Sequence, residues 1–284
     1  MSTKPKINPS SMAFMKNNEV HTKQQFGCIR NTLLLQNGVK TGSIPEILAV
    51  MGDQHEVEIG RLLDKACRQY VREEWLPIDM EDFDLRFRGR VDYHLADEKT
   101  VIECKALASK PKRSSIIRKG NVPLNHVAQV TSYMYQYKYT TGWLVYSYYQ
   151  YAGPDTNKIV CPAPDRFGES RRWFKVTIDD DGAIYIDGER YEYSFIDLML
   201  YIKEHEYVMK TKEIPSRPFI DISNPYSSPC TYCSWATACD KVDAAEIMSE
   251  KPSLEQFIEW AEEVVHKESD YDLFRPKREL KEYL

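Results

Sequence analysis

Two short β-favouring runs with a turn between them constrain the fold of this chain more than any other feature. The runs cover residues 85–95 and 100–106, and the turn-like residues 96–99 separate them. This pattern predicts a β-hairpin with a four-residue loop. In such a hairpin Leu95 pairs with Thr100, which fixes the register of both strands.

The predicted register gathers charged side chains on one face of the hairpin. Counting back from the turn, Asp92 lies opposite Glu103, and Lys105 shares the face of Glu103 because side chains alternate along a strand. Cys104 points to the other face. Two carboxylates paired across strands repel each other by up to roughly 1 kcal/mol at an exposed site, so a fold that keeps them usually supplies a cation.

A divalent metal ion is the natural compensation for this carboxylate pair. Hard oxygen ligands suit Mg²⁺ or Mn²⁺, and such an ion lowers the pKa of bound water and stabilises charge on a phosphodiester. Lys105 would then orient the water or neutralise developing charge. The alternative is an exposed hairpin with ordinary surface charges. Val101 and Ile102 favour a mostly buried strand instead, where unpaired carboxylates are costly.

The remaining periodicity predicts a mixture of helices and strands. With 284 residues, 42% of them hydrophobic, the chain can bury a sizeable core, and we expect one compact α/β unit with a C-terminal extension. The expected helices are 24–36, which carries Cys28, then 44–75 with an interruption near Gly52, 125–138, 195–212 and 254–266. The further expected strands are 142–149 and a second hairpin, 173–178 with 183–186.

Three of the seven cysteines stand close together, because Cys230, Cys233 and Cys239 follow a C-x2-C-x5-C spacing. We expect the chain in the cytoplasm, since it shows neither a secretory signal nor an apolar run of the ~18 to 20 residues that a membrane span needs. Thiols there stay reduced and are used for metal ligation. Cys28 is the candidate fourth ligand of a zinc ion or an iron–sulfur cluster. Unligated thiols are the third alternative.

Four sequence elements together resemble the RecB-like branch of the PD-(D/E)XK nuclease superfamily. That branch has a histidine on an upstream helix after a glycine, then a G-x-x-D element, an E-x-K element and a Q-x-x-x-Y helix. This chain has them in the same order, with Val91 in place of the superfamily's nominal proline. They are His55 in Gly52-Asp53-Gln54-His55-Glu56, then Gly89-Arg90-Val91-Asp92, Glu103-Cys104-Lys105, and Gln129 with Tyr133.

The resemblance implies a restriction-endonuclease-like core, which is a mixed central sheet flanked by helices. This core would cover residues 21–245, with a loose segment at 1–20 and a helical extension at 246–284. The implied ligands of Mg²⁺ or Mn²⁺ are His55, Asp92, Glu103 and the main-chain carbonyl of Cys104, with Lys105 assisting catalysis. Gln129 and Tyr133 share one helical face, which the family turns toward the DNA. Packing of that helix on the sheet is the alternative.

The cysteine arrangement is similar to that of iron–sulfur members of this branch. One cysteine before the histidine helix and three after the nuclease core occur in the CRISPR-adaptation (Cas-four type) family and in AddB-like recombination nucleases. That resemblance implies a structural [4Fe-4S] cluster, which joins the N- and C-terminal segments through Cys28, Cys230, Cys233 and Cys239. The resemblance covers the chain from about Cys28 to Cys239.

A basic stretch follows the E-x-K strand directly. Residues 110–119 carry five positive charges and no acidic residue, so they are candidates for contacts with DNA phosphates. The alternative is a solvated basic loop. The overall net charge of −5 does not exclude DNA, because a local basic groove can form in an acidic chain. The basic residues are Lys110, Lys112, Arg113, Arg118 and Lys119.

These features predict a metal-dependent DNA exonuclease of a bacterial or phage-infected cell. The resemblance alone implies single-stranded ends, 5′ to 3′ polarity, and partners in recombination or CRISPR adaptation. No G-x4-G-K-[ST] signature is present, so we expect no nucleotide cofactor, and any ATP-driven unwinding must come from a partner. One alternative is a catalytically inactive nuclease fold that binds DNA or a protein. Another is a redox-sensing cluster protein.

Overall fold

The computed structural model describes residues 20–21, 28–39, 46–83, 85–108, 113–151, 159–162, 170–215 and 235–267. Contacts divide the chain into two compact units, Pro45–Lys203 and Met1–Ile44 with Glu204–Leu284. The predicted boundaries at 20 and 245 stay a prediction. Within the described ranges, no helix combines the length and the apolar character needed to cross a membrane.

The unit Pro45–Lys203 is an α/β structure built on a mixed sheet, as expected. Within this unit the sheet order is β2-β3-β4-β5-β8-β9-β10, and only the β4–β5 pairing is parallel among these strands. Strands β6 and β7 pair separately. The strands are β2 (Val71–Met80), β3 (Leu85–Leu95), β4 (Thr100–Leu107), β5 (Thr141–Tyr148), β6 (Gln150–Tyr151), β7 (Ile159–Val160), β8 (Arg171–Ile178), β9 (Ile184–Ile186) and β10 (Glu189–Arg190).

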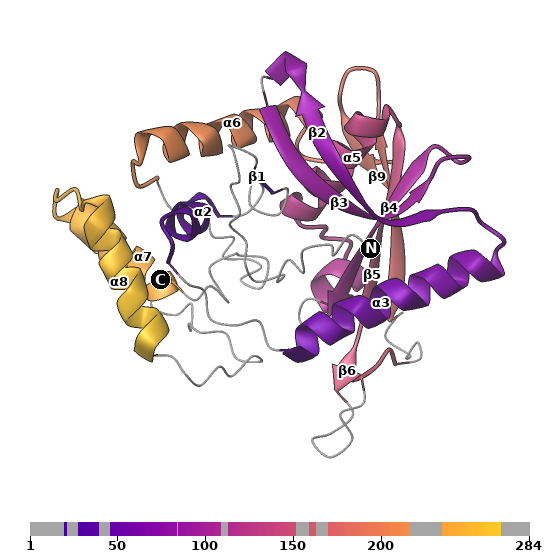
Figure 1. Cartoon of the computed structure of the whole chain (residues 1–284), viewed down its shortest axis with the longest axis horizontal. Coiled ribbons are helices and arrows are strands. Elements are labelled where there is room, and N and C mark those ends of the chain that lie inside the picture. Colours follow the sequence, from indigo (N-terminus) through magenta and orange to yellow (C-terminus); the bar gives the residue numbers. More distant parts are fainter. Residues whose placement is uncertain are drawn as a thin grey trace, which may run out of the picture. The chain divides into compact units, whose positions relative to one another are not determined.

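Helices α3 (Glu46–Lys65) and α5 (Leu124–Tyr137) lie against opposite faces of this sheet (Figure 1). Alternate residues of β3, β4 and β5 pack with Ile59 and Leu63 of α3 in one hydrophobic cluster. The intervening residues face α5, where Gly142 lies against Met134. The shorter elements of the unit are the 3-10 turn Glu81–Phe83 and the π-helical turn Arg113–Arg118, and α6 (Phe195–Thr211) starts here.

The predicted hairpin is present with the predicted register, since Leu95 pairs with Thr100. The β3–β4 ladder continues to Tyr93↔Ile102 and stops there, one position short of Asp92. The ladder between β2 and β3 also has no pair at Asp92. Asp92 therefore lies at a position of β3 where the ladders to β2 and to β4 both lack a pair.

The predicted helix over residues 44–75 is wrong in two respects. Helix α3 runs without interruption through Gly52 and ends at Lys65, and Val71 begins β2. Cys67 closes the helix in the left-handed conformation, with φ 54°, and the Arg68 N–H donates to the Leu63 carbonyl. No glycine stands at this position, so the sequence carried no ordinary signal for the end of the helix.

The other elements that were predicted in this unit lie within a residue or two of their predicted positions, including the second hairpin, whereas the short strands β6, β7 and β10 were not predicted. Its turn is held by Asp179, whose carboxylate accepts the N–H groups of Asp181 and Ala183. Because Asp favours Asx turns of this kind, the four-residue turn of this hairpin can be predicted from the sequence.

The second unit contains β1 (Val20–His21), α2 (Ile29–Gln36), α7 (Ala236–Ile247) and α8 (Leu254–Lys267). Leu34, Trp235, Val242 and Phe257 belong to its hydrophobic core. Cys28 was expected inside a helix, but it is the extended N-cap residue of α2, and residues 24–27 lie outside the described part of the chain. Helix α7 was not predicted.

A buried arginine joins α2 to α7 within this unit. Arg30 is 1% exposed and donates to Asp243 Oδ1 at 2.6 Å, to the Cys239 carbonyl at 3.3 Å and to the Pro215 carbonyl at 2.6 Å. A buried guanidinium is tolerated only when it is paired and hydrogen-bonded in this way. Segments from both ends of the sequence therefore share one core.

Candidate active site

A chain of hydrogen bonds connects three of the predicted motifs on the α5 face of the sheet. Lys105 Nζ contacts Glu103 Oε1 and donates to Gln129 Oε1 at 3.0 Å. Gln129 Nε2 donates to the Tyr133 hydroxyl at 3.0 Å, and that hydroxyl donates to the Arg90 carbonyl at 3.0 Å. Gln129 and Tyr133 are buried, so their contacts fix the Lys105 ammonium. Their predicted contact with DNA remains a prediction.

Asp92 approaches the same site through the backbone of β4. The Cys104 N–H donates to Asp92 Oδ2 at 2.7 Å, and Asp92 and Glu103 are only 5% and 2% exposed. The Cys104 side chain packs toward α3, as alternation predicted. Burial raises the pKa of its thiol, so the thiol is neutral. Asp92, Glu103 and Lys105 thus share a buried region.

Burial and neighbouring carboxylates shift the pKa values of two further groups of the site. Burial and then the Asp92 carboxylate raise the pKa of Glu56, on α3, to about 7. Burial alone would lower the pKa of Lys105, but the Glu103 and Asp92 carboxylates outweigh it and raise that pKa. Arg90 and Arg72 lie beside Glu56 and oppose the rise of its pKa.

His55 reaches the sheet from α3, the helix on the other face. Its Nε2 lies 3.0 Å from the Val145 carbonyl, and its Nδ1 lies 3.4 Å from the Tyr149 hydroxyl. Burial lowers the pKa of His55 to about 4, so the imidazole is neutral at neutral pH. In the described part of the chain, no three His, Cys, Asp or Glu side chains form a group that could hold a metal ion. The predicted ligand set of His55, Asp92, Glu103 and the Cys104 carbonyl therefore remains a prediction.

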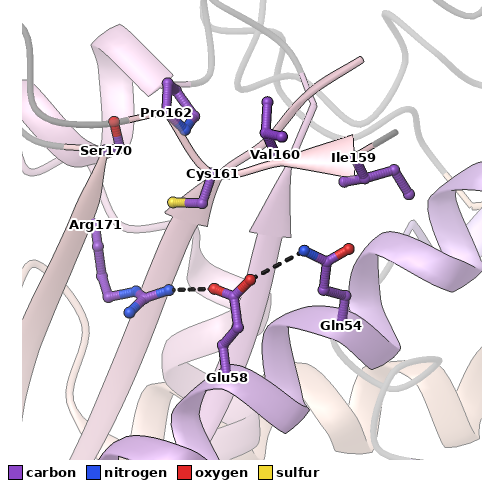
Figure 2. Close-up of a pocket in the computed structure, with 8 residues that line it drawn as sticks. All are labelled: Gln54, Glu58, Ile159, Val160, Cys161, Pro162, Ser170 and Arg171. Carbon is purple, nitrogen blue, oxygen red and sulfur yellow. Dashed lines mark hydrogen bonds and ion pairs between the residues drawn. The ribbon is translucent and has the colours of Figure 1, made fainter. Parts of the chain in front are cut away.

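A pocket of about 540 Å³ opens one helical turn beyond His55. Figure 2 shows Glu58 on α3 between Arg171 and Gln54, to which it is joined by the dashed lines. Ile159, Val160, Cys161, Pro162 and Ser170 complete the lining. Sequence reasoning missed this group. Only the three-residue spacing between His55 and Glu58 could have indicated it, because Arg171 is distant in sequence.

The predicted basic contacts fall into three groups. Lys110 and Lys112 lie outside the described residues, while Arg118 and Lys119 are exposed. Arg113 is only 8% exposed, and its guanidinium lies over the Tyr148 ring at 5.2 Å. Burial of Arg113 leaves little of it to reach a phosphate, so Arg118 and Lys119 are the better candidates among the described positions.

Two of the four predicted cluster cysteines are described. Cys28 and Cys239 belong to the same unit, and Arg30, two residues after Cys28, donates to the Cys239 carbonyl. Cys230 and Cys233 lie outside the described residues. The structure thus brings the backbones around Cys28 and Cys239 together.

No family model and no curated protein matches this sequence. Among solved structures, the chain is similar to a protein designated SSO0001, at 16% identity and a TM-score of 0.43, over 80% of this chain and 88% of that one. It is also similar to an alkaline exonuclease from Laribacter hongkongensis, at 12% identity and a TM-score of 0.42, over 68% and 89%. A phage-related exonuclease from Haemophilus somnus gives 10% identity and a TM-score of 0.42, over 65% and 82%. Values this low say nothing of what this chain does.

Gly89 makes room for Tyr133, and replacing it tests the packing of the site. A Cβ at Gly89 would lie 2.2 Å from Tyr133 Cε1, so Gly89→Ala must displace a buried ring. We expect this variant to lose about 1–3 kcal/mol of unfolding free energy, measured by urea denaturation. The control Gly52→Ala, whose Cβ meets nothing within 4 Å in helix α3, should gain up to about 1 kcal/mol. Equal stability of Gly89→Ala and the wild type would contradict this packing.

Proposed function

We propose that this chain is a divalent-metal-dependent DNA exonuclease. The observation that carries the proposal is the pair of buried carboxylates, Asp92 and Glu103, with the partly buried Lys105 ammonium beside them on the α5 face of the sheet. Ordinary surface charges would not be buried together, because two like charges in a dry site are costly without compensation. The motif order in the sequence adds the expectation of phosphodiester chemistry.

The donor set fits a hard divalent cation. Asp92 and Glu103 offer carboxylate oxygens, the ligands that Mg²⁺ and Mn²⁺ prefer, and the Cys104 carbonyl and His55 are the further candidates. Lys105 supplies one positive charge against these two buried carboxylates. A bound ion would supply Lewis-acid activation of water and charge stabilisation at the phosphate.

Lys105 is the residue that we expect to meet the scissile phosphate. Glu103 and Gln129 take two of its three N–H groups, so the ammonium is oriented before substrate binds. Gln129 is itself oriented by Tyr133, and Tyr133 by the Arg90 carbonyl. Such preorganised charge lowers the barrier because little rearrangement is needed as negative charge develops.

The proposed substrate is a DNA end, with single-stranded 5′ ends favoured by the family resemblance. Arg118 and Lys119 are exposed and would hold the phosphate backbone. Recombination or CRISPR-adaptation proteins are the proposed partners. The competing function is an inactive fold that binds DNA, and the retained Asp92, Glu103 and Lys105 favour the enzyme.

Removing either carboxylate tests this function directly. We expect Asp92→Asn and Glu103→Gln to slow Mn²⁺-dependent degradation of end-labelled single-stranded DNA at least about a hundredfold, because a lost ion withdraws several kcal/mol of transition-state stabilisation. Glu98→Gln, on the exposed turn of the same hairpin, is the matched control and should retain wild-type activity. A wild type that binds DNA but never cuts it would favour the inactive subunit.

We also propose that Cys28, Cys230, Cys233 and Cys239 bind a structural [4Fe-4S] cluster. The tight trio with one distant cysteine supports iron–sulfur over zinc, whose structural sites usually use two close pairs. The Arg30 contacts, which bring Cys28 and Cys239 into one unit, support the pairing of the chain's two ends. Four metal–thiolate bonds would stabilise this unit, because the free energy of metal binding adds to that of folding.

Iron analysis of anaerobically purified protein tests the cluster. We expect close to four iron and four sulfide ions per chain, and substantial loss of both in Cys28→Ser and Cys239→Ser, since each variant removes a ligand. Cys67→Ser, at an exposed cysteine of the other unit, should keep the wild-type content. Stoichiometric zinc without iron would overturn the assignment, as would a metal-free protein of full stability.

A further inference from the structure

We propose that Arg172 binds a phosphate of the DNA strand close to the one that Lys105 meets, and so forms a second phosphate site on the α5 face of the sheet. This inference rests on the proposed nuclease function and adds to it a residue that contacts the substrate away from the point of cleavage. Arg172 stands outside the four sequence motifs and outside the basic stretch 110–119, so the sequence alone did not indicate it.

The first step concerns the place of Arg172 in the sheet. Lys105 on β4 pairs with Tyr146 on β5, and Tyr146 pairs in turn with Arg172 on β8. Residues paired directly across strands share a face, so these three form one row. Lys105 and Tyr146 contact Gln129 and His126 of α5, which shows that the row faces this helix. Two strand spacings place the backbones of Arg172 and Lys105 roughly 9–10 Å apart.

The second step concerns what holds the Arg172 guanidinium. Nη1 donates to the Ile117 carbonyl at 3.0 Å, and Nη2 donates to Asp187 Oδ2 at 3.3 Å. The guanidinium carbon lies 4.3 Å from the centroid of the Phe174 ring. Gly120 also lies against the group, since a Cβ there would be 3.7 Å from both terminal nitrogens. The positive charge is therefore oriented before a ligand binds.

The third step concerns what the guanidinium can still bind. Arginine has five N–H donors in a planar fork, and within the described part of the chain only two of those of Arg172 have an acceptor. The side chains of Arg172 and Asp187 are 33% and 38% exposed, so their ion pair is solvated and weak. A phosphate can therefore bind the remaining donors while the Ile117 carbonyl keeps its contact.

The fourth step concerns the basic turn that contacts Arg172. Arg118 and Lys119 are exposed and directly follow Ile117, whose carbonyl accepts from Arg172. The side chains of Ile116 and Ile117 are buried and anchor the turn. Three positive side chains thus belong to one end of the row that starts at Lys105. A DNA backbone complements this charge, because phosphate contacts supply most of the affinity in non-specific DNA binding.

Neutralising single phosphates of the substrate tests the contact. A methylphosphonate linkage has no charge, and one is placed in turn at each position of a short, labelled single strand. We expect the wild-type affinity, measured by fluorescence anisotropy without divalent metal, to fall about tenfold at the phosphate that Arg172 binds. In Arg172→Gln the same position should no longer matter. A purely structural role would weaken binding of all these strands equally and keep the wild-type dependence on position.

The salt dependence of binding is a second readout. Arg172→Gln should lower the slope of log affinity against log salt by about 0.7, the contribution of one phosphate of a single strand. Arg172→Lys keeps the charge and should keep most of this slope, even if Arg172→Gln does not fold. Lys175→Gln, at an exposed lysine on the opposite face of β8, is the matched control and should bind like the wild type.

The outcomes separate this inference from the proposed function. Loss of the effect at one position in Arg172→Gln, with the control unchanged, supports the inference. A variant with the position dependence and salt slope of the wild type overturns it, and the proposed function then stands if the wild type degrades DNA with Mn²⁺. A wild type that neither binds nor degrades single-stranded DNA overturns both.

Discussion

The burial of Asp92 and Glu103 on one face of the sheet is the constraint on which the rest of the site depends. Both carboxylates lie where β3 and β4 stop pairing, so their charges must be balanced by specific partners rather than by water. The Cys104 N–H and the Lys105 ammonium supply part of that balance. The proposed divalent ion would supply the rest. The same ion would then both balance the buried charge and supply the chemistry of the site.

Three of the four motifs are coupled by contacts, and these contacts explain why their residue types occur together. Tyr133 can donate to the Arg90 carbonyl only because Gly89 has no side chain, and the same hydroxyl orients the Gln129 amide. That amide then accepts from Lys105. A glycine on β3 and a tyrosine on α5 thus determine the orientation of an ammonium on β4, although none of these residues is close to another in sequence.

Local patterns predicted the parts of the fold that local physics determines, and missed those set by tertiary contacts. Alternation and turn chemistry were enough to place the hairpin and its Leu95–Thr100 register, and helical periodicity was enough to place α5. The end of α3 was missed because Cys67 adopts a left-handed conformation with no glycine. The approach of Arg171 to Glu58 joins residues far apart in sequence, and no local pattern encodes such a contact.

The central claim is that Asp92 and Glu103 bind a divalent ion, and crystals soaked in Mn²⁺ test it most directly. Anomalous diffraction locates the ion without reference to activity or to the iron–sulfur proposal. The account predicts an anomalous peak within ligand distance of the Asp92 and Glu103 carboxylates and of the Cys104 carbonyl oxygen. A protein that degrades DNA with Mn²⁺ bound elsewhere, and with no peak between these two carboxylates, would contradict it.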